Sequence, residues 1–298
     1  MEQFFKFWFL QVSRGYSIPM SLTNWLLIFV LCIFSSQANW LYGIIALVGF
    51  MFAHMGTNVF DDVIDQWLKV PKQKYKSTHL DNGQTNVKTI LKLAIFYFIV
   101  AGLIGAFFVI KCGFTVAIIA FIGAVIALLY PRLNNFALGE LAVGLTFGPL
   151  FFAGINFVML EKIELNNILI SFPVAIFTVI VLMVHALMDY DFDIKSGKKT
   201  LIILMGSKKA GLNLIIILML FAYLFTIILV CTKSLPLLSL LTLVTSFGLI
   251  PLYKKLDFYI NSTEHKEDEF IKNFGVARNI GTAYCLILAV SLILNNLL

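Results

Sequence analysis

The sequence predicts an all-α, polytopic membrane protein with about nine transmembrane helices, and three observations support this. Hydrophobic residues make up 60% of the 298 positions and charged residues only 13%, and the mean hydropathy is +0.93. Apolar runs long enough to cross a bilayer recur along the whole chain, and lysines and arginines gather in every second loop between them. Such a chain is too apolar for an ordinary soluble domain and too long for a single anchor. No linker divides it, so we expect one domain over residues 1–298.

Each predicted span is an apolar run of roughly 20 residues bounded by polar or charged ones. The third and fourth runs are separated only by Lys111 and Cys112, and the fifth contains "TFGPL", whose Gly and Pro neighbouring helices can accommodate. Before the first run, "MEQFFKFWFLQVSR" mixes apolar residues with Lys6 and Arg14 and lacks a cleavage site, so we expect an amphipathic lead-in at the membrane surface rather than a signal peptide. In chain order, the predicted spans are residues 17–36, 40–64, 89–110, 113–130, 138–160, 166–188, 211–232, 235–252 and 275–297.

The basic residues predict how these helices are oriented. With nine spans, all but three of the 22 Lys and Arg residues lie on the side that holds the N-terminus, the exceptions being Lys111, Lys162 and Lys233. The positive-inside rule therefore predicts a multi-pass protein of the cell inner (cytoplasmic) membrane, with its N-terminus in the cytoplasm and its C-terminus outside. The net charge of +6 follows from this topology and needs no nucleic acid as a partner.

Aspartates cluster at two points where apolar runs end. Of the 16 Asp and Glu residues, six lie in "DDVID" and "DYDFD", which close the second and sixth spans and so lie on the cytoplasmic side. Asp61 and Asp65 are four residues apart, which places both on one helical face. Asp189 and Asp193 have the same spacing. The separation from Asp61 to Asp189 equals that from Asp65 to Asp193, which indicates an internal repeat that sets the two pairs opposite one another.

Paired carboxylates at a membrane boundary predict a site for a hard cation. Like charges on one helical face repel one another unless a cation neutralises them. Oxygen ligands without His or Cys favour Mg²⁺, which takes one or two carboxylates and completes its shell with phosphate oxygens. The alternative for either cluster alone is a solvated acidic helix end, but two matched clusters beside lysine-rich loops favour the cation site. Lys198 and Lys199, in "GKKT" just after Asp193, are the predicted partners for phosphate.

Three further polar residues are candidates for the site. Asn58 lies one helical turn before the first aspartate pair. Glu140 opens the fifth span as a carboxylate in an apolar stretch, which is typical of a functional residue, although the dipole of a helix also favours an acid at its N-terminus. His185, one turn before Asp189, is either a polar group satisfied within the bundle or a base.

Together, these stretches resemble the two signatures of the UbiA superfamily of intramembrane aromatic prenyltransferases. The resemblance lies in "NVFDDVID" and "DYDFDIKSGKKTL", and "LGELAVGLTFGPLFFAGINFV" resembles the branch that prenylates 1,4-dihydroxy-2-naphthoate in menaquinone synthesis. In that family, nine helices surround a central cavity, and two Mg²⁺ ions bridge the diphosphate of a polyprenyl donor to the aspartates. The isoprenoid tail of the donor runs out towards lipid.

The resemblance implies a function and a set of site residues. The expected activity is Mg²⁺-dependent transfer of a polyprenyl group, within the lipid bilayer, from a polyprenyl diphosphate to an aromatic acceptor, 1,4-dihydroxy-2-naphthoate before others. The whole chain would then be a single transmembrane prenyltransferase domain. The expected metal ligands, which are also the catalytic residues, are Asp61, Asp65, Asp189 and Asp193. The expected substrate-binding residues are Asn58, Glu140, Lys198 and Lys199.

The first signature differs in spacing from the family pattern. The family places its asparagine four residues before the first aspartate, whereas Asn58 precedes Asp61 by three. Counting four residues from Asn58 instead reaches Asp62 and then Gln66. We prefer Asp61 and Asp65, because that register matches the second pair, but the sequence alone leaves both registers open.

Two other functional classes fit parts of the pattern. A cation-coupled transporter also places aspartates in helices, but normally near the bilayer midplane at broken helices, whereas these aspartates lie at helix ends. A terpene cyclase on the same scaffold would use the same diphosphate site without an aromatic acceptor. The resemblance of the middle segment favours aromatic prenyl transfer. The exact acceptor, the prenyl chain length and the oligomeric state do not follow from the sequence.

Overall fold

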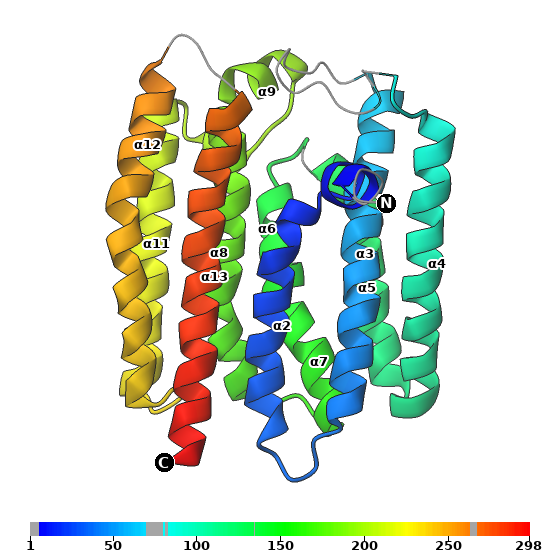
Figure 1. The fold of residues 1–298 in the computed structure, drawn as a ribbon, viewed down its shortest axis with the longest axis vertical. Helices are drawn as coiled ribbons and strands as arrows, with labels where there is room; N and C mark the ends of the chain where they lie inside the picture. The colour runs from blue at the N-terminus through cyan, green and yellow to red at the C-terminus, as the bar shows by residue number, and fades with distance from the viewer. Residues whose placement is uncertain (1–5, 70–79, 81–82, 134, 263–266) are drawn as a thin grey trace.

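A computed structural model describes the chain except for residues 1–5, 70–79, 81–82, 134 and 263–266 (Figure 1). The described part is helical and has no strand. Most helices run along one common axis, with α4 at one edge of the bundle and α11 and α12 at the other (Figure 1). The helices are η1 (Lys6–Val12), η2 (Gly15–Ser17), α2 (Ile18–Ile33), α3 (Trp40–Trp67), α4 (Val87–Cys112), α5 (Phe114–Leu133), α6 (Gly139–Leu145), η3 (Thr146–Leu150), α7 (Phe151–Leu160), α8 (Leu165–Met188), α9 (Tyr190–Ser196), α10 (Leu201–Leu204), α11 (Lys208–Cys231), η4 (Leu237–Gly248), α12 (Leu249–Asn261) and α13 (Glu267–Leu297).

Nine helical segments in the described part are long and apolar enough to cross a membrane, which confirms the predicted fold class. Their bounds agree with the predicted spans to within a few residues, except at the end of the eighth. In chain order they are Gly15–Ile33, Trp40–Trp67, Val87–Cys112, Phe114–Leu133, Gly139–Leu160, Leu165–Met188, Lys208–Cys231, Leu237–Asn261 and Lys272–Leu297.

The eighth span is longer than the sequence suggested. We expected it to end at residue 252, just before Lys254 and Lys255, but α12 continues to Asn261. Its buried residues are Leu252, Leu256 and Tyr259, which repeat at the spacing of one helical face. The lysines lie on the exposed face, so they do not end the helix.

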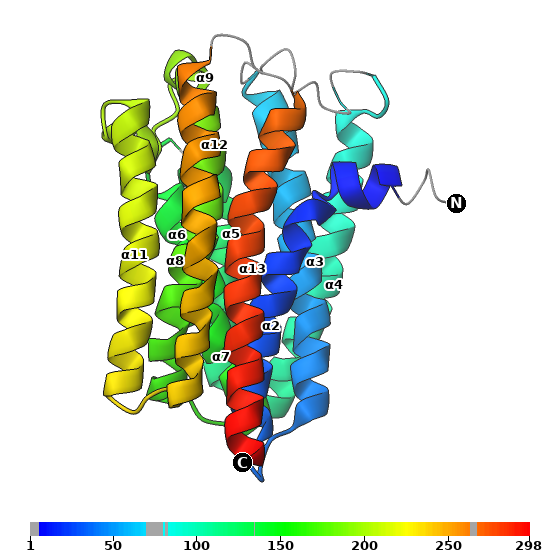
Figure 2. The same ribbon diagram turned by 60° about the vertical axis from the view of Figure 1, so that its left-hand side comes forward.

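In the described part of the N-terminal lead-in, η1 is helical and lies across the direction of the bundle (Figure 2). Phe7 and Trp8 pack against a small apolar cluster that includes Val59, Val63 and Ile90 from α3 and α4. The hydroxyl of Ser13, just after η1, lies 3.0 Å from the hydroxyl of Tyr97 in α4. The lead-in is therefore packed onto the same end of the bundle that holds "DDVID".

The fifth span is broken in its middle. It consists of α6, the π-helical turn η3 and α7, and Gly148 within η3 has non-helical φ and ψ angles of −110° and −108°. Pro149 supplies no backbone N–H, which weakens the helix at the same point. Asn24 of α2 donates a hydrogen bond from Nδ2 to the carbonyl of Phe147 over 3.2 Å. A buried amide thus holds the break in place, as membrane interiors require for a freed carbonyl.

We expect Gly148→Ala to lower the stability of the bundle, because a Cβ at this position would lie 2.5 Å from the Cβ of Ala175 in α8. Overpacking of this kind costs about 1–3 kcal/mol of unfolding free energy. The matched control is Gly102→Ala in α4, where an added Cβ meets nothing within 4 Å. Thermal unfolding of the two purified variants in detergent measures the difference. Equal melting temperatures would contradict the close approach of η3 and α8.

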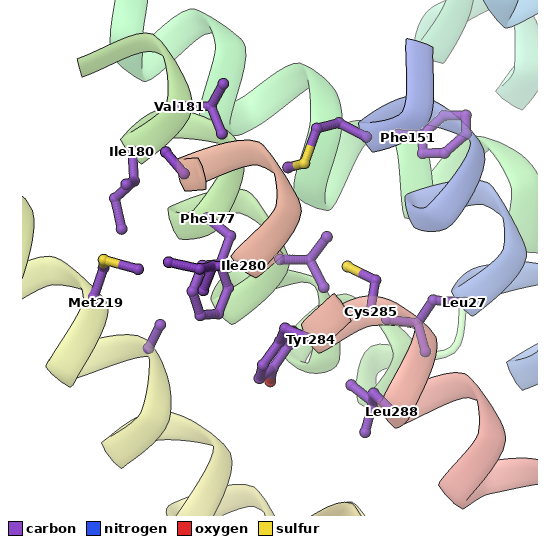
Figure 3. Packing of buried hydrophobic residues seen from close by; sticks show 14 of the residues in the cluster. Leu27, Phe151, Phe177, Ile180, Val181, Met219, Ile280, Tyr284, Cys285 and Leu288 are labelled. Atoms are coloured by element: carbon purple, nitrogen blue, oxygen red, sulfur yellow. The ribbon is translucent and has the colours of Figure 1, made fainter. Parts of the chain in front are cut away.

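The bundle is densely packed on one side only. Phe177 of α8 stacks on Tyr284 of α13 with ring centroids 4.6 Å apart, and Leu27 of α2 and Met219 of α11 complete this part of the core (Figure 3). The buried hydroxyl of Tyr284 is satisfied by Thr226 at 2.6 Å. Helices α4 and α5 bury few residues by comparison. Residues of α4 and α5 line a cavity instead.

Candidate active site

A cavity of about 1560 Å³ lies inside the bundle and takes lining residues from both aspartate clusters. Seven of the eight site residues expected from the sequence line it, although they come from four separate parts of the chain. These seven are Asn58, Asp61, Asp65, Glu140, Asp189, Asp193 and Lys198. The eighth, Lys199, is exposed and is not among the lining residues. The cavity joins the predicted cation and phosphate residues at one end of the molecule.

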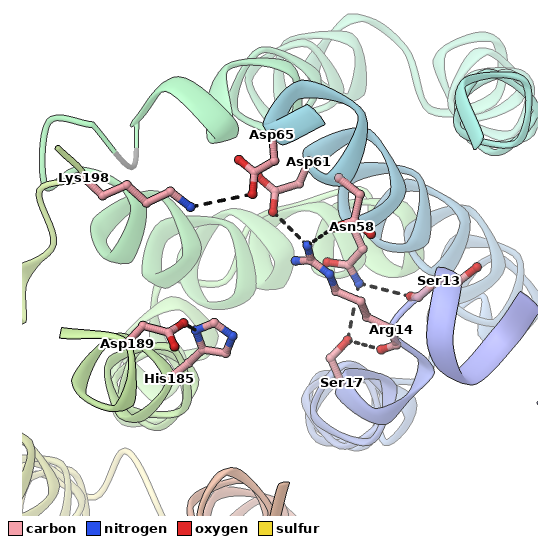
Figure 4. Close-up of polar contacts among 10 residues, drawn as sticks. Ser13, Arg14, Ser17, Asn58, Asp61, Asp65, His185, Asp189 and Lys198 are labelled. Atoms are coloured by element: carbon pink, nitrogen blue, oxygen red, sulfur yellow. Dashed lines mark hydrogen bonds and ion pairs between the residues drawn. The ribbon is translucent and has the colours of Figure 1, made fainter. Parts of the chain in front are cut away.

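The first aspartate cluster lies in the last turns of α3 and is bound by an arginine. Arg14 Nη2 lies 3.1 Å from Asp61 Oδ2 (Figure 4), and it also lies 2.5 Å from Asp62 Oδ1. Arg14 has a left-handed backbone, with φ 52° and ψ 45°, between η1 and η2. This turn carries the guanidinium from the lead-in over the end of α3. The sequence did not predict this pairing, nor that Asp62 also lines the cavity.

Arg14 stays charged in this position. Burial alone would lower its pKa, but the carboxylates of Asp62 and Asp61 outweigh that effect and hold the pKa of Arg14 well above its ordinary value. A fixed positive charge therefore offsets part of the repulsion between the carboxylates. Any cation that binds Asp61 shares those oxygens with the guanidinium.

The second cluster lies where α8 meets α9. Asp189 lies between the end of α8 and the start of α9, and Asp193 belongs to α9. The backbone N–H of Asp193 donates to the carbonyl of Asp189 over 2.8 Å. This bond keeps the two residues one helical turn apart, as the sequence predicted, although a helix junction separates them. His185 Nδ1 lies 3.3 Å from Asp189 Oδ2 (Figure 4).

Lys198 links the two clusters. It follows the second cluster in sequence, yet its Nζ lies 3.7 Å from Asp65 Oδ2 of the first (Figure 4). Burial alone would lower the pKa of Lys198, but Asp65, Asp61 and Asp193 together raise it above its ordinary value. A permanent ammonium group thus lies between the clusters, where an anionic ligand would meet it.

The carboxylates fit Mg²⁺ that is held jointly with a ligand. In the part of the chain that the structure describes, no three His, Cys, Asp or Glu side chains converge to enclose a metal ion by themselves. Magnesium commonly takes only one or two carboxylates and fills its octahedron with water and phosphate oxygens. Two carboxylate pairs facing one cavity match this requirement. We therefore expect tight metal binding only when a phosphate ligand is present.

Glu140 and Lys199 hold the loop that carries Lys198. Glu140 is 2% exposed, and its Oε1 accepts a hydrogen bond from the backbone N–H of Leu201 over 2.9 Å. The carbonyl of Lys199 accepts one from the N–H of Ala137, also over 2.9 Å. Thr200 caps α10 through the N–H of Ile203. These bonds tie the "GKKT" turn to the start of α6 and so fix where Lys198 can reach.

Beyond the charged end, the cavity is aromatic and apolar. Phe50 lies 4.0 Å from Phe151 and 5.3 Å from Phe147 between ring centroids, and all three rings line the cavity. His54 of α3, which was not among the residues expected from the sequence, lies among them. The wall formed by α4 and α5 presents small residues. They include Ala101, Gly102, Gly105, Ala117, Ala120 and Gly123.

We expect Arg14→Gln to destabilise the protein chiefly when no cation replaces the guanidinium, because it leaves the carboxylates of Asp61 and Asp62 unneutralised. Breaking such a partly buried pair costs about 1–3 kcal/mol of unfolding free energy. Thermal unfolding in EDTA should show the loss, and Mg²⁺ with a prenyl thiodiphosphate should recover most of it. As a control, Lys209→Gln removes an exposed ion pair with Asp257. It should change the melting temperature little, either in EDTA or with Mg²⁺ and the thiodiphosphate. An equal loss with and without the ligand would contradict the shared site.

Comparison with known proteins agrees with this architecture. The model of the UbiA prenyltransferase family matches residues 23–275. The 1,4-dihydroxy-2-naphthoate octaprenyltransferase of Bacillus subtilis (strain 168) is 29% identical over 206 residues, which is 67% of this chain and 66% of that protein. The match thus spans just under two thirds of the length of this relative.

Solved structures share the fold over nearly the whole chain. A UbiA homologue from Archaeoglobus fulgidus bound to GPP and Mg²⁺ has a TM-score of 0.63 at 15% identity, covering 95% of this chain and 99% of that one. A UbiA homologue from Aeropyrum pernix K1 has a TM-score of 0.68 at 14% identity, covering 94% and 98%. At these identities the likeness concerns the fold. Since the family model covers most of the chain and the bundle has the same architecture, the protein belongs to the UbiA prenyltransferase family.

Proposed function

We propose that the protein transfers a polyprenyl group from a polyprenyl diphosphate to an aromatic acceptor, with 1,4-dihydroxy-2-naphthoate as the first candidate, in quinone biosynthesis. The observation that carries this proposal is a single cavity with two chemically distinct parts. One end holds five buried or half-buried aspartates with Arg14 and Lys198, and the remainder is mostly apolar and aromatic. A diphosphate suits the first part, and an isoprenoid tail with an aromatic ring suits the second.

The charged end is suited to bind and activate the diphosphate. Asp61 and Asp65 would hold one Mg²⁺, and Asp189 and Asp193 a second, which accounts for the matched pairs. When bound, the metal offsets the negative charge that develops on the leaving diphosphate. Lys198 adds a fixed positive charge between the pairs, and preorganised charge of this kind commonly lowers such a barrier more than any other single effect.

The aromatic part of the cavity is suited to the transfer itself. When the allylic C–O bond breaks, the prenyl fragment carries positive charge, which the faces of aromatic rings stabilise. Phe50, Phe147 and Phe151 line the space next to the charged end and also exclude water, which would otherwise capture the cation. An electron-rich hydroxylated ring held there forms the new C–C bond and then regains aromaticity by losing a proton or CO₂.

The choice of acceptor rests on the Bacillus relative, whose name specifies 1,4-dihydroxy-2-naphthoate and an octaprenyl donor. The experiment is incubation of the purified protein in detergent with Mg²⁺, a polyprenyl diphosphate and a panel of dihydroxynaphthoate, hydroxybenzoate and homogentisate. Mass analysis should show a prenylated naphthalene product. A prenylated product from another acceptor would reassign the acceptor alone. A cyclised hydrocarbon formed without an acceptor would identify a terpene cyclase.

The protein would lie in the cytoplasmic membrane with both aspartate clusters facing the cytoplasm. In a variant without native cysteines, we expect that Lys199→Cys will not be labelled when an impermeant thiol reagent is added to intact cells. Lys72 is also on the predicted cytoplasmic side, but it lies outside the described residues. Lys233→Cys should be labelled, because Lys233 lies in the exposed loop after the C-terminal end of α11. The N-terminal end of α11 is the one that follows the Lys199 loop. The reverse labelling pattern would show that the protein has the opposite orientation in the membrane.

A further inference from the structure

We propose that His54 binds the aromatic acceptor by donating a hydrogen bond from Nε2 to an oxygen on its ring, and so selects acceptors that carry a ring hydroxyl. This assignment rests on the proposed prenyl transfer and adds an acceptor-recognising residue to it. His54 takes no part in binding the diphosphate, and its side chain contacts none of the aspartates through a hydrogen bond or ion pair given by the structure.

His54 lies on the same face of α3 as the first aspartate cluster. It precedes Asn58 by four residues, Asp61 by seven and Asp65 by eleven, which are the intervals of one helical face. At 1.5 Å per residue, its Cα lies about 10 Å deeper in the bundle than that of Asp61. Both ends of this row line the cavity. A substrate next to a diphosphate held at Asp61 would therefore lie at the depth of His54.

The hydrogen bonds around His54 identify which ring nitrogen carries the hydrogen. Ser17 Oγ donates its only hydrogen to the carbonyl of Arg14 over 2.8 Å, so it has none left for the imidazole. Its contact with His54 Nε2, at 3.3 Å, therefore has Nε2–H as the donor. On the other side, Ser21 Oγ lies 2.9 Å from Nδ1, where its hydroxyl can donate. For a neutral imidazole, these contacts assign the ring hydrogen to Nε2.

This arrangement makes His54 a donor rather than a base. Nδ1 is occupied by the hydroxyl of Ser21, and Nε2 already carries its hydrogen, so neither nitrogen is ready to accept a proton. The Nε2 contact with Ser17 is long, and Ser17 Oγ also lies 3.4 Å from Asn58 Nδ2, which donates to it. A ligand oxygen at a normal distance of about 2.9 Å would be a better acceptor for Nε2–H.

The surroundings of His54 fit a flat aromatic ligand. Its ring meets Phe147 edge to face at 5.1 Å between centroids, and Phe147 in turn meets Phe50 edge to face at 5.3 Å. Rings arranged in this way offer both faces and edges to a further ring. A few placed polar groups among aromatic walls are the usual composition of a pocket that recognises an oxygenated aromatic compound.

The test compares two ligands that differ only in the ring hydroxyl. Equilibrium binding of 1-hydroxy-2-naphthoate and of 2-naphthoate is measured for the full-length protein in detergent. Because a buried donor left without its acceptor is costly, we expect the wild-type protein to bind the hydroxylated compound about tenfold more tightly. His54→Phe should remove this preference, whereas His54→Gln, which keeps an N–H donor, should retain part of it. Tyr253→Phe, which removes a hydroxyl that lies outside the cavity and contacts Lys209, should retain all of it.

A second measurement separates this role from a general loss of structure. His54→Phe should bind a farnesyl thiodiphosphate with Mg²⁺ within about twofold of the wild type, because the aspartate clusters are unchanged. A full hydroxyl preference in His54→Phe, with donor binding intact, would overturn the assignment while leaving prenyl transfer standing. Failure of the wild-type protein to form any prenylated product would instead overturn the proposed function.

Discussion

Replacing Asp61 or Asp65 by asparagine is expected to lower the rate of prenyl transfer by at least about 100-fold, whereas Asp62→Asn should keep a substantial part of the activity. Each of the first two changes would remove a charged ligand of the proposed Mg²⁺ from the end of the cavity. Asp62 points about 100° away from Asp61 around the helix, and its carboxylate is bound by Arg14. The measurement is the initial rate of product formation at saturating Mg²⁺ and donor.

The three variants differ only in which carboxylate becomes an amide, so each serves as a control for the others. Their melting temperatures in detergent should lie close together, since asparagine has nearly the same shape as aspartate. Loss of activity confined to Asp62→Asn would show that the alternative register of Asn58 and Asp62 is the correct one.

A second large effect is expected when the two clusters are disabled together. If Asp61 and Asp189 hold one metal-bridged diphosphate jointly, Asp61→Ala and Asp189→Ala should each weaken donor binding by at least about 100-fold. The double variant should then be little worse than either single one, because residues that act as one unit are strongly non-additive.

This cycle is measured as equilibrium binding of a prenyl thiodiphosphate in Mg²⁺, with the four proteins side by side. A variant of an exposed acidic residue, Asp257→Ala, supplies the control for charge removal away from the cavity. Two fully additive losses would mean that the clusters bind separately, and would argue against a shared site.

The fold followed from the sequence because burial in a membrane leaves long uninterrupted apolar runs. Eight of the nine spans end within a few residues of the predicted boundary. The end of the eighth span was wrong because Lys254 and Lys255 lie on the exposed face of a helix that continues with Leu256 and Tyr259 inside. The break at Gly148 depends on the close approach of α8, which no local pattern records.

The aspartate clusters were visible in the sequence because their spacing matches a helical face. The partners of the clusters were not. Arg14 reaches Asp61 through a left-handed turn between two short helices, and Lys198 reaches Asp65 across the cavity. His54 could have been found from its spacing, since it continues the row of Asn58 and Asp61 by one turn. Lys199 was expected to bind the diphosphate, and in the structure it is exposed and is not among the residues that line the cavity.

Membership of the UbiA prenyltransferase family separates the protein from the ion-transporter alternative. The structure adds a physical reason against ion transport. The aspartates gather at one end of a cavity, beside Arg14 and Lys198, and the break in the fifth span carries no charge. A cation pathway would need charged groups along its length.

One measurement tests the joint diphosphate site without any mutation. It is the binding of a farnesyl thiodiphosphate to the wild-type protein, first in Mg²⁺ and then in EDTA. We expect binding in Mg²⁺ and a loss of at least about 100-fold in EDTA, because about three negative charges on the ligand would otherwise face the carboxylates of both clusters. Binding of 1-hydroxy-2-naphthoate should survive chelation, since it depends on the aromatic part of the cavity. Tight donor binding in EDTA would contradict a metal-bridged site and leave Arg14 and Lys198 as the diphosphate-binding groups.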